Sequence, residues 1–322
     1  MKRVALVVAT GVVAAFLIGA GDEARAATDR PNAVLLLSAP CDADNFLCPA
    51  FARALRRTGT SGRIVSPDPR EDRLSSLTLL VRQGYDLVVM DPGWIDILGT
   101  VARRFPRTAF AVVDPPPSAP KRPNIHRVTV RPHEAAFLAG WLSAKLERRR
   151  PGADAVGIVA GARIPPVEDF VVGFRAGARR AAPGIDVLVG YSQDFADPRK
   201  CEAIARDQIA RGAGAVFNVA GSCGLGALAA ARRGQVWGVG VDVDQAFLGP
   251  HILTSVVKHY DAAFARVLRE RGRGPRSLFL GLRDGATGLG RVSPKVPTAL
   301  RKELDAVRRR IVAGEIRVPG AQ

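Results

Sequence analysis

Residues 155–190 read AVGIVAGARIPPVEDFVVGFRAGARRAAPGIDVLVG. Two short apolar runs, 155–159 and 186–190, flank a stretch at 167–182 in which apolar residues recur with helical spacing. A strand, a helix and a second strand in this order predict a βαβ unit, in which the strands run parallel and the helix covers one face of their sheet.

The same alternation of strand and helix continues along most of the chain. The other candidate strands are 33–38, 62–66, 86–90, 109–113, 126–130, 215–218 and 236–241, and the other candidate helices are 49–58, 94–105, 133–149 and 198–211. Because one doubly wound domain of average size uses fewer strands, we expect an α/β fold with two parallel-sheet lobes.

The boundary between the two lobes is expected near Val130. Consecutive prolines at 115–117 follow the fourth candidate strand, and a long candidate helix begins soon after Pro132. Proteins with two such sheets bind ligands at the carboxyl ends of the strands, in the crevice between the lobes. The residues that follow each strand are therefore the first candidates for a binding site.

Residues 1–26 have the pattern of a secretory signal peptide. Lys2 and Arg3 precede an apolar run at 4–20, and Ala24-Arg25-Ala26 supplies small residues for cleavage. The alternative is a retained membrane anchor, for which this run is at the short limit of what spans a bilayer. We expect an exported protein, periplasmic or extracellular.

The chain is strongly basic, with 47 Lys and Arg against 30 Asp and Glu and a formal net charge of +17. Such a surplus favours anionic partners such as a nucleic acid, a lipid surface or a phosphorylated ligand. The arginines are scattered over candidate helices and no aromatic residues are interleaved with them. We therefore predict no nucleic-acid partner.

The sequence contains no recognisable catalytic or metal-binding pattern. It has no Gly-x-Ser-x-Gly elbow, no helical His pair and no conspicuous arrangement of Cys with His. The 4 cysteines fit no zinc spacing, and in an exported protein an even number favours disulfides. We expect neither an enzyme nor a metal or other cofactor.

Carboxylates and aromatic rings are the candidates for binding a polar solute. The carboxylates at strand ends are Asp42, Asp91, Asp114, Asp242 and Asp244, and the candidate rings are Phe51, Phe170, Phe174 and Phe217. Each carboxylate can accept hydrogen bonds from sugar hydroxyls, or it can cap the next helix or turn. Each ring can stack on a flat ligand or pack in the core. Gly221 and its neighbouring glycines permit close approach of a ligand to the backbone.

Residues 163–177 resemble a family signature. The sequence RIPPVEDF at 163–170, followed by Gly173-Phe174 and Gly177, is similar to the IPPVxxFxxGFxxG pattern of the basic membrane protein family, the PnrA-like nucleoside-binding components of ABC importers. Further stretches agree in order at 85–89, 137–140, 217–221, 240–245, 253–258, 281–285 and 314–319. The resemblance covers essentially the whole chain after the signal peptide.

The resemblance implies a type I periplasmic-binding-protein fold, in which the chain passes three times between the lobes. The first lobe is then 27–130 with 254–280, and the second is 131–253 with 281–322. It also implies a purine nucleoside as ligand, without a cofactor. The residues implied to contact it are Phe51 and Phe217 as stacking rings, Asp42, Asp114, Asp244 and Lys258 at the ribose, and Gly221 close by.

One departure from the family pattern lies near the N-terminus. Asp42 and Phe46 match the family motif, but Leu47 stands where the family has Asn. Cys41 and Cys48 flank this altered loop, which suggests a local disulfide between them.

The other two cysteines are placed by topology. Cys201 near the start of a helix and Cys223 just after the following strand both fall on the carboxyl edge of a sheet, so they are able to bond. The rival pairing joins Cys41 to Cys223 and would lock the two lobes together.

The leading hypothesis is a monomeric extracytoplasmic binding protein that closes on a nucleoside-like solute and delivers it to an ABC permease, which keeps it near the membrane. A second hypothesis keeps the fold and makes the protein a ligand-sensing ectodomain for another small polar solute. A third is a nucleoside-cleaving enzyme.

Overall fold

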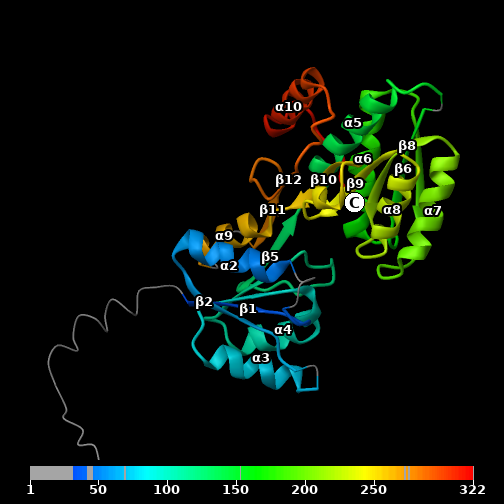
Figure 1. Ribbon diagram of the computed structural model, residues 1–322. Coiled ribbons are helices and arrows are strands. Elements are labelled where there is room, and N and C mark those ends of the chain that lie inside the picture. The colour runs from blue at the N-terminus through cyan, green and yellow to red at the C-terminus, as the bar shows by residue number, and fades with distance from the viewer. Residues whose placement is uncertain are drawn as a thin grey trace, which may run out of the picture.

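The computed structural model describes residues 32–41, 46–68, 70–152, 154–271, 273–274 and 276–321. Asp42 and the expected signal peptide lie outside these residues. The described chain forms two lobes, each built around one sheet with helices on both faces (Figure 1). No helix in these residues is long and apolar enough to cross a membrane.

The first lobe contains a sheet with the strand order β11-β5-β4-β3-β1-β2. Its strands are β1 (Asn32–Leu36), β2 (Ser61–Val65), β3 (Leu87–Met90), β4 (Ala109–Val113), β5 (Ile125–Val130) and β11 (Ser277–Leu280). All neighbouring pairs in this sheet are parallel. Each strand predicted up to Val130 overlaps one of these strands.

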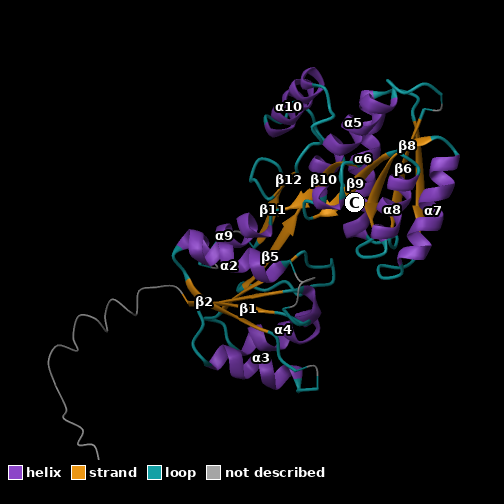
Figure 2. Cartoon of the chain, in the orientation of Figure 1, coloured by secondary structure: helices purple, strands orange, loops and turns teal. Residues whose placement is uncertain are grey.

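The second lobe contains a sheet with the strand order β12-β10-β9-β8-β6-β7. Its strands are β6 (Ala155–Ala160), β7 (Asp186–Tyr191), β8 (Ala213–Val219), β9 (Trp237–Asp242), β10 (Ile252–Lys258) and β12 (Thr287–Leu289). Only β12 at the edge is antiparallel to its neighbour among the pairs of this described sheet. The two sheets with alternating helices confirm the predicted α/β fold class (Figure 2).

Helices bury both faces of the first sheet. α2 (Leu47–Thr58) and α9 (Tyr260–Glu270) cover one face, whereas α3 (Arg73–Arg82), α4 (Ile95–Arg104) and the short η1 (Pro92–Trp94) cover the other. Successive residues of β1 point to opposite faces, so Leu35 packs in the core under α2 and α9, and Leu36 packs in the core under α3 and α4. Both side chains are fully buried, as expected for a central parallel strand.

The second sheet is covered in the same way. α5 (His133–Glu147), α6 (Pro165–Ala181) and α10 (Thr298–Val312) pack on one face, and α7 (Pro198–Ala210) and α8 (Gly224–Arg233) on the other. The glycines of the family signature have a packing role here. A Cβ at Gly173 would come within 2.2 Å of the His133 carbonyl oxygen, and one at Gly177 within 1.9 Å of that of Phe137. These glycines therefore let α6 approach α5 closely.

The chain passes between the sheets after β5, after β10 and between β11 and β12. One expected boundary is wrong, because residues 254–258 belong to the second sheet rather than the first. The strand β10 pairs with β9 on one side and β12 on the other up to Lys258, so the crossing follows Lys258. This shift places Lys258 at a carboxyl strand end, directly beside the crossing.

Candidate functional site

A buried charged cluster joins the carboxyl edges of the two sheets. Lys258 Nζ lies 2.9 Å from Asp114 Oδ2, and the Tyr260 hydroxyl donates to the same oxygen at 2.5 Å. The other oxygen of Asp114 accepts a hydrogen bond from the Val130 amide at 2.8 Å. The side chains of Lys258 and Asp114 are only 8% and 19% exposed. Since Asp114 follows β4 and Lys258 ends β10, this ion pair connects one sheet to the other.

Two carboxylates at this edge occupy unusual backbone conformations. Asp114 has φ 45° and Asp242, which ends β9, has φ 63°. Positive φ is uncommon outside glycine, although Asp tolerates it better than most residues. Backbone strain of this kind tends to gather at functional sites. Asp242 is level with Val257 on the neighbouring β10, so its carboxylate belongs to the same edge as Lys258.

The electrostatics of the cluster follow from burial and close opposite charges. Burial raises the pKa of Asp242, although the Lys258 ammonium partly opposes this effect. Burial alone would lower the pKa of Lys258, but Tyr260, Asp114 and Asp242 around it raise that pKa well above its ordinary value. Burial and the Asp114 charge likewise raise the pKa of Tyr260. Lys258 is therefore a cation and Tyr260 a neutral hydroxyl at neutral pH, and both act as hydrogen-bond donors.

Exposed aromatic rings lie at both carboxyl edges, and the second edge carries Phe247 in η2 (Ala246–Leu248), 74% exposed, in addition to Phe195. Phe46, at the start of α2, is 38% exposed and stacks on Tyr260 with ring centres 5.4 Å apart. Phe195, in the loop between β7 and α7, is 44% exposed. A ring that is exposed beside polar groups has a free surface for a flat ligand.

The ring of Phe195 lies over the ends of the central strands of the second sheet. A Cβ at Gly161, just after β6, would come within 2.3 Å of Phe195 Cε1. A Cβ at Gly221, after β8, would lie 3.2 Å from the Phe195 carbonyl oxygen and 3.7 Å from its Cβ. Gly221 also has φ 54°, a conformation that favours glycine. Glycine at these two positions leaves the room that Phe195 occupies.

The expected stacking roles of Phe51 and Phe217 are wrong. Both side chains are fully buried. Phe51 packs edge-on against Phe264 between α2 and α9, and Phe217 stacks on Phe174 beneath α6. Each ring fills a lobe core, so neither has a face available to a ligand.

The structure brings only some of the remaining expected site residues together. Asp114 and Lys258 lie together in the charged cluster, and Gly221 lies beside Phe195. The carboxylate of Asp244 instead accepts hydrogen bonds from the amides of Ala246 and Arg291, both at 3.2 Å. Asp244 therefore braces a turn of the second lobe. Asp42 lies outside the described residues.

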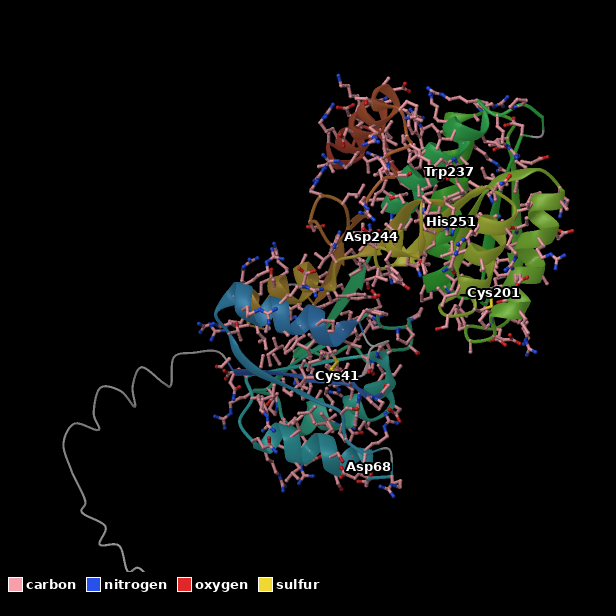
Figure 3. The ribbon with its side chains drawn as sticks, viewed as in Figure 1. Cys41, Asp68, Cys201, Trp237, Asp244 and His251 are labelled. Carbon is pink, nitrogen blue, oxygen red and sulfur yellow. A yellow bond between two sulfur atoms is a disulfide. The ribbon has the colours of Figure 1, made fainter. Side chains whose placement is uncertain are left out.

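The disulfides join cysteines within each lobe. Cys41 bonds to Cys48, and Cys201 bonds to Cys223. Figure 3 shows Cys41 in the first lobe and Cys201 in the second. The two local pairings are thus confirmed, and the rival bond from Cys41 to Cys223 is not formed, so no disulfide among the described cysteines locks the lobes together.

Sequence reasoning missed three members of the site, namely Phe46, Phe195 and Tyr260, and it named Asp242 only as one of several carboxylates at strand ends. Phe46 and Phe195 follow strands β1 and β7, at the carboxyl edge where ligands of such folds bind. Applying that rule to aromatic residues as well as to carboxylates would have selected Phe46 and Phe195. Nothing in the sequence pattern distinguishes Tyr260, because its role depends on the crossing after Lys258.

The fold and the site define a two-lobed α/β protein of the type I periplasmic-binding-protein class. Solved structures share this fold. A solute-binding protein of an ABC transporter system from Aeropyrum pernix K1 is 22% identical, covers 90% of this chain and 94% of its own, and has a TM-score of 0.71. A transcriptional activator of the comK gene from Bacillus halodurans has a TM-score of 0.75 at 19% identity, over 90% of this chain and 99% of its own.

Sequence comparison gives the family. The model of the family described as "ABC transporter substrate-binding protein PnrA-like" matches residues 57–322, and the chain belongs to this family. Basic membrane protein B of Borrelia garinii subsp. bavariensis is 30% identical over 261 residues, which cover 76% of this chain and 73% of that protein. The CD4+ T-cell-stimulating antigen of Listeria monocytogenes is 27% identical over 271 residues, 77% of this chain and 74% of that one.

Family membership confirms the recognised resemblance and gives the general function. The chain is a substrate-binding protein of the ABC transporter type, a class that binds small molecules outside the cytoplasm.

Proposed function

We propose that the protein binds a purine-nucleoside-like ligand at the facing carboxyl edges of its sheets and delivers it to an ABC permease. One observation carries the proposal: each sheet presents an exposed aromatic ring, Phe46 or Phe195, and a charged cluster joins the two edges. A flat base and a sugar with neighbouring hydroxyls match these two kinds of group.

The proposed assignment of contacts follows from the chemistry of the side chains. The carboxylates of Asp114 and Asp242 accept hydrogen bonds from ribose hydroxyls, and Lys258 donates one. The rings of Phe46 and Phe195 stack on the base and supply most of the apolar contact. Asp244 stays a candidate contact at the rim, and Gly221 acts through the position of Phe195.

Contacts from both lobes make the ligand favour the closed arrangement. The three crossings between the sheets provide the connection about which two lobes can close. A ligand that touches Phe46 on one lobe and Phe195 on the other binds the closed form better, and this difference in affinity drives closure. The permease then receives a closed, loaded monomer.

Calorimetry and thermal shift with adenosine, guanosine and inosine test the ligand class, with ribose, free purines and arabinose as comparisons. We expect nucleosides to raise Tm and to bind more tightly than either ribose or the free base. If another ligand class raises Tm and nucleosides do not, the nucleoside assignment is wrong.

One variant tests the stacking role of Phe195, and a second serves as its control. Phe195→Ala is expected to weaken nucleoside binding by roughly 1–3 kcal/mol. Phe279→Ala removes another exposed ring, 55% exposed on the edge strand β11, and is expected to leave affinity unchanged.

Chromatography of the nucleoside after long incubation with the protein tests for cleavage. We expect the nucleoside to stay intact, because a cleaving enzyme would release free base.

A further inference from the structure

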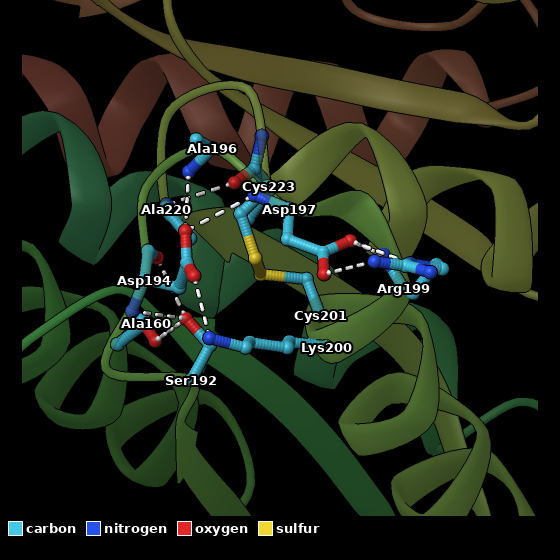
Figure 4. The surroundings of a disulfide bond; sticks show 11 residues. Ala160, Ser192, Asp194, Ala196, Asp197, Arg199, Lys200, Cys201, Ala220 and Cys223 are labelled. Carbon is cyan, nitrogen blue, oxygen red and sulfur yellow. Dashed lines mark hydrogen bonds and ion pairs between the residues drawn. A yellow bond between two sulfur atoms is a disulfide. The ribbon is translucent and has the colours of Figure 1, made fainter.

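The Cys201–Cys223 disulfide lies beside the loop that carries Phe195, because the backbone of Cys223 is hydrogen-bonded to that of Phe195. Cys201 is in the first turns of α7 and Cys223 immediately precedes α8, so the bond ties together the starts of two helices at the carboxyl edge of the second sheet (Figure 4). Both cysteines are fully buried. The bond therefore fixes the internal framework of this edge.

The backbone of Phe195 rests on the segment that carries Cys223. The Cys223 amide donates a hydrogen bond to the Phe195 carbonyl oxygen at 3.0 Å. Gly221, two residues before Cys223, approaches the same carbonyl group and leaves no room for a larger residue without a shift. The loop between β8 and α8 is thus the seat on which Phe195 sits.

The other side of the Phe195 loop is attached to the start of α7. The Asp194 carboxylate accepts hydrogen bonds from the amides of Ala196 at 2.7 Å and Asp197 at 3.0 Å, and it pairs with Lys200 Nζ at 2.6 Å. Asp197 caps α7 by accepting from the Arg199 amide at 3.0 Å. Lys200 is the neighbour of Cys201, so the disulfide connects this attachment to the seat.

We propose that Cys201 and Cys223 are positioning residues for the ligand, because their disulfide holds the Phe195 ring at the place where it stacks. This inference rests on the proposed function for its effect on affinity. The ring is 44% exposed, so its own packing fixes it less than a buried ring is fixed. Its position therefore depends on the backbone beneath it, and a ring held in place binds with less loss of side-chain and loop entropy.

The other disulfide provides a matched control within the same chain. Cys41 and Cys48 bracket Phe46 in sequence, but the Phe46 ring has a direct partner in Tyr260. Removing the Cys41–Cys48 bond therefore tests what the loss of a local disulfide does without disturbing the seat of Phe195.

A double-mutant cycle on nucleoside affinity tests the proposal. The variants are C201S/C223S, Phe195→Ala and the combination of all three changes. We expect C201S/C223S to weaken binding by roughly tenfold in the wild-type background and by less than about twofold in the Phe195→Ala background. The pair C41S/C48S should have the same effect in both backgrounds. Equal losses for C201S/C223S in both backgrounds would show that the disulfide does not act through Phe195.

Hydrogen exchange without ligand gives a second readout that does not depend on the nucleoside. In C201S/C223S, amides at 194–197 and 223 should exchange faster, whereas those at 46–58 should not change. Unchanged exchange at 194–197 overturns the proposal even if nucleosides do not bind. If C201S/C223S does not fold, Asp194→Ala keeps the bond, removes the attachment to α7 and should show the same coupling to Phe195. Additive effects there also overturn the proposal.

Discussion

The two ring-bearing loops, one in each lobe, present Phe46 and Phe195 in different ways. Phe46 stacks on Tyr260, whose hydroxyl donates to Asp114 in the charged cluster. Phe195 instead sits over Gly161 and Gly221, with its backbone carbonyl held by Cys223. A ring in the first lobe is therefore coupled to the polar site, whereas a ring in the second lobe is coupled to a covalently fixed framework.

Because of this difference, changes in the two loops should act differently on the affinity for the ligand and on the stability of the protein. Changes in the first lobe should alter both together, because Phe46, Tyr260 and Asp114 form one connected set. Changes at Phe195 should alter affinity while the core of the second lobe stays intact, because that core lies beneath the strand ends and contains Phe174 and Phe217.

The largest expected effect comes from removing a buried ring. Its size is the reference against which the effects of removing the two exposed rings are compared. Phe217→Ala should destabilise the protein by about 3–5 kcal/mol, because it leaves a cavity against Phe174 and Phe170. Denaturant unfolding followed by circular dichroism measures this loss. A fully stable Phe217→Ala variant that fails to bind nucleoside would restore Phe217 as a ligand contact.

Asp114→Asn should have the next largest effect, and it acts on the link between the lobes. Asn tolerates the positive φ of this position and retains an acceptor for the Val130 amide. The charge opposite the buried Lys258 is lost while a polar acceptor remains, which we expect to cost about 2–3 kcal/mol of stability, the size of a hydrogen bond to a charged group. The same denaturant experiment measures it, with Asp96→Asn at an exposed ion pair as the control. Equal small losses in both variants contradict the assignment of the cluster as a buried link.

Phe46→Ala and Phe195→Ala test whether the two exposed rings are held in different ways. Both should weaken nucleoside binding by roughly 1–3 kcal/mol, through the loss of stacking. Only Phe46→Ala should also lower the Tm of the free protein, because it removes the ring contact with Tyr260. Calorimetry and thermal unfolding on the same samples give the two quantities. If Phe195→Ala lowers Tm as much as Phe46→Ala does, the two rings are not held differently.

Asp242→Asn should have the smallest effect, and its sign depends on pH. Burial raises the pKa of Asp242 above 3.8, so the folded protein keeps this proton at pH values where the unfolded chain has lost it. Asp242 therefore contributes progressively less stability as the pH rises above 3.8. We expect Asp242→Asn to raise Tm by roughly 2–4 °C at pH 7 and by less at pH 4. A decrease in Tm for Asp242→Asn at pH 7 would contradict the burial argument.

Much of the fold could be predicted because buried parallel strands are short apolar runs separated by helices. The predicted strand at 109–113 coincides with β4, and the predicted helix at 198–211 ends one residue beyond α7. The helix α3 was missed because Leu74 and Leu79 are exposed and interrupt the amphipathic pattern. The edge strands β11 and β12 were missed because they are short, and β12 has only 3 residues.

The candidate site was predicted less well because its residues are set by tertiary placement. A central strand of a parallel sheet covered on both faces is buried on both sides, as β8 is, so periodicity does not show which core Phe217 faces. Phe51 is on the buried face of α2, whereas Phe46 lies five positions earlier, at the start of that helix. Asp114 and Lys258, 144 positions apart, meet only because the second crossing follows β10.

Nucleoside binding between the two lobes is decided by calorimetric titration of the ligand-free wild-type protein with guanosine and inosine, in parallel with ribose and guanine. We expect saturable binding of at least one nucleoside, tighter than that of ribose or free base, because base and sugar contact different groups of the site. Binding of ribose as tightly as the nucleoside, or no binding of any nucleoside, would contradict this expectation.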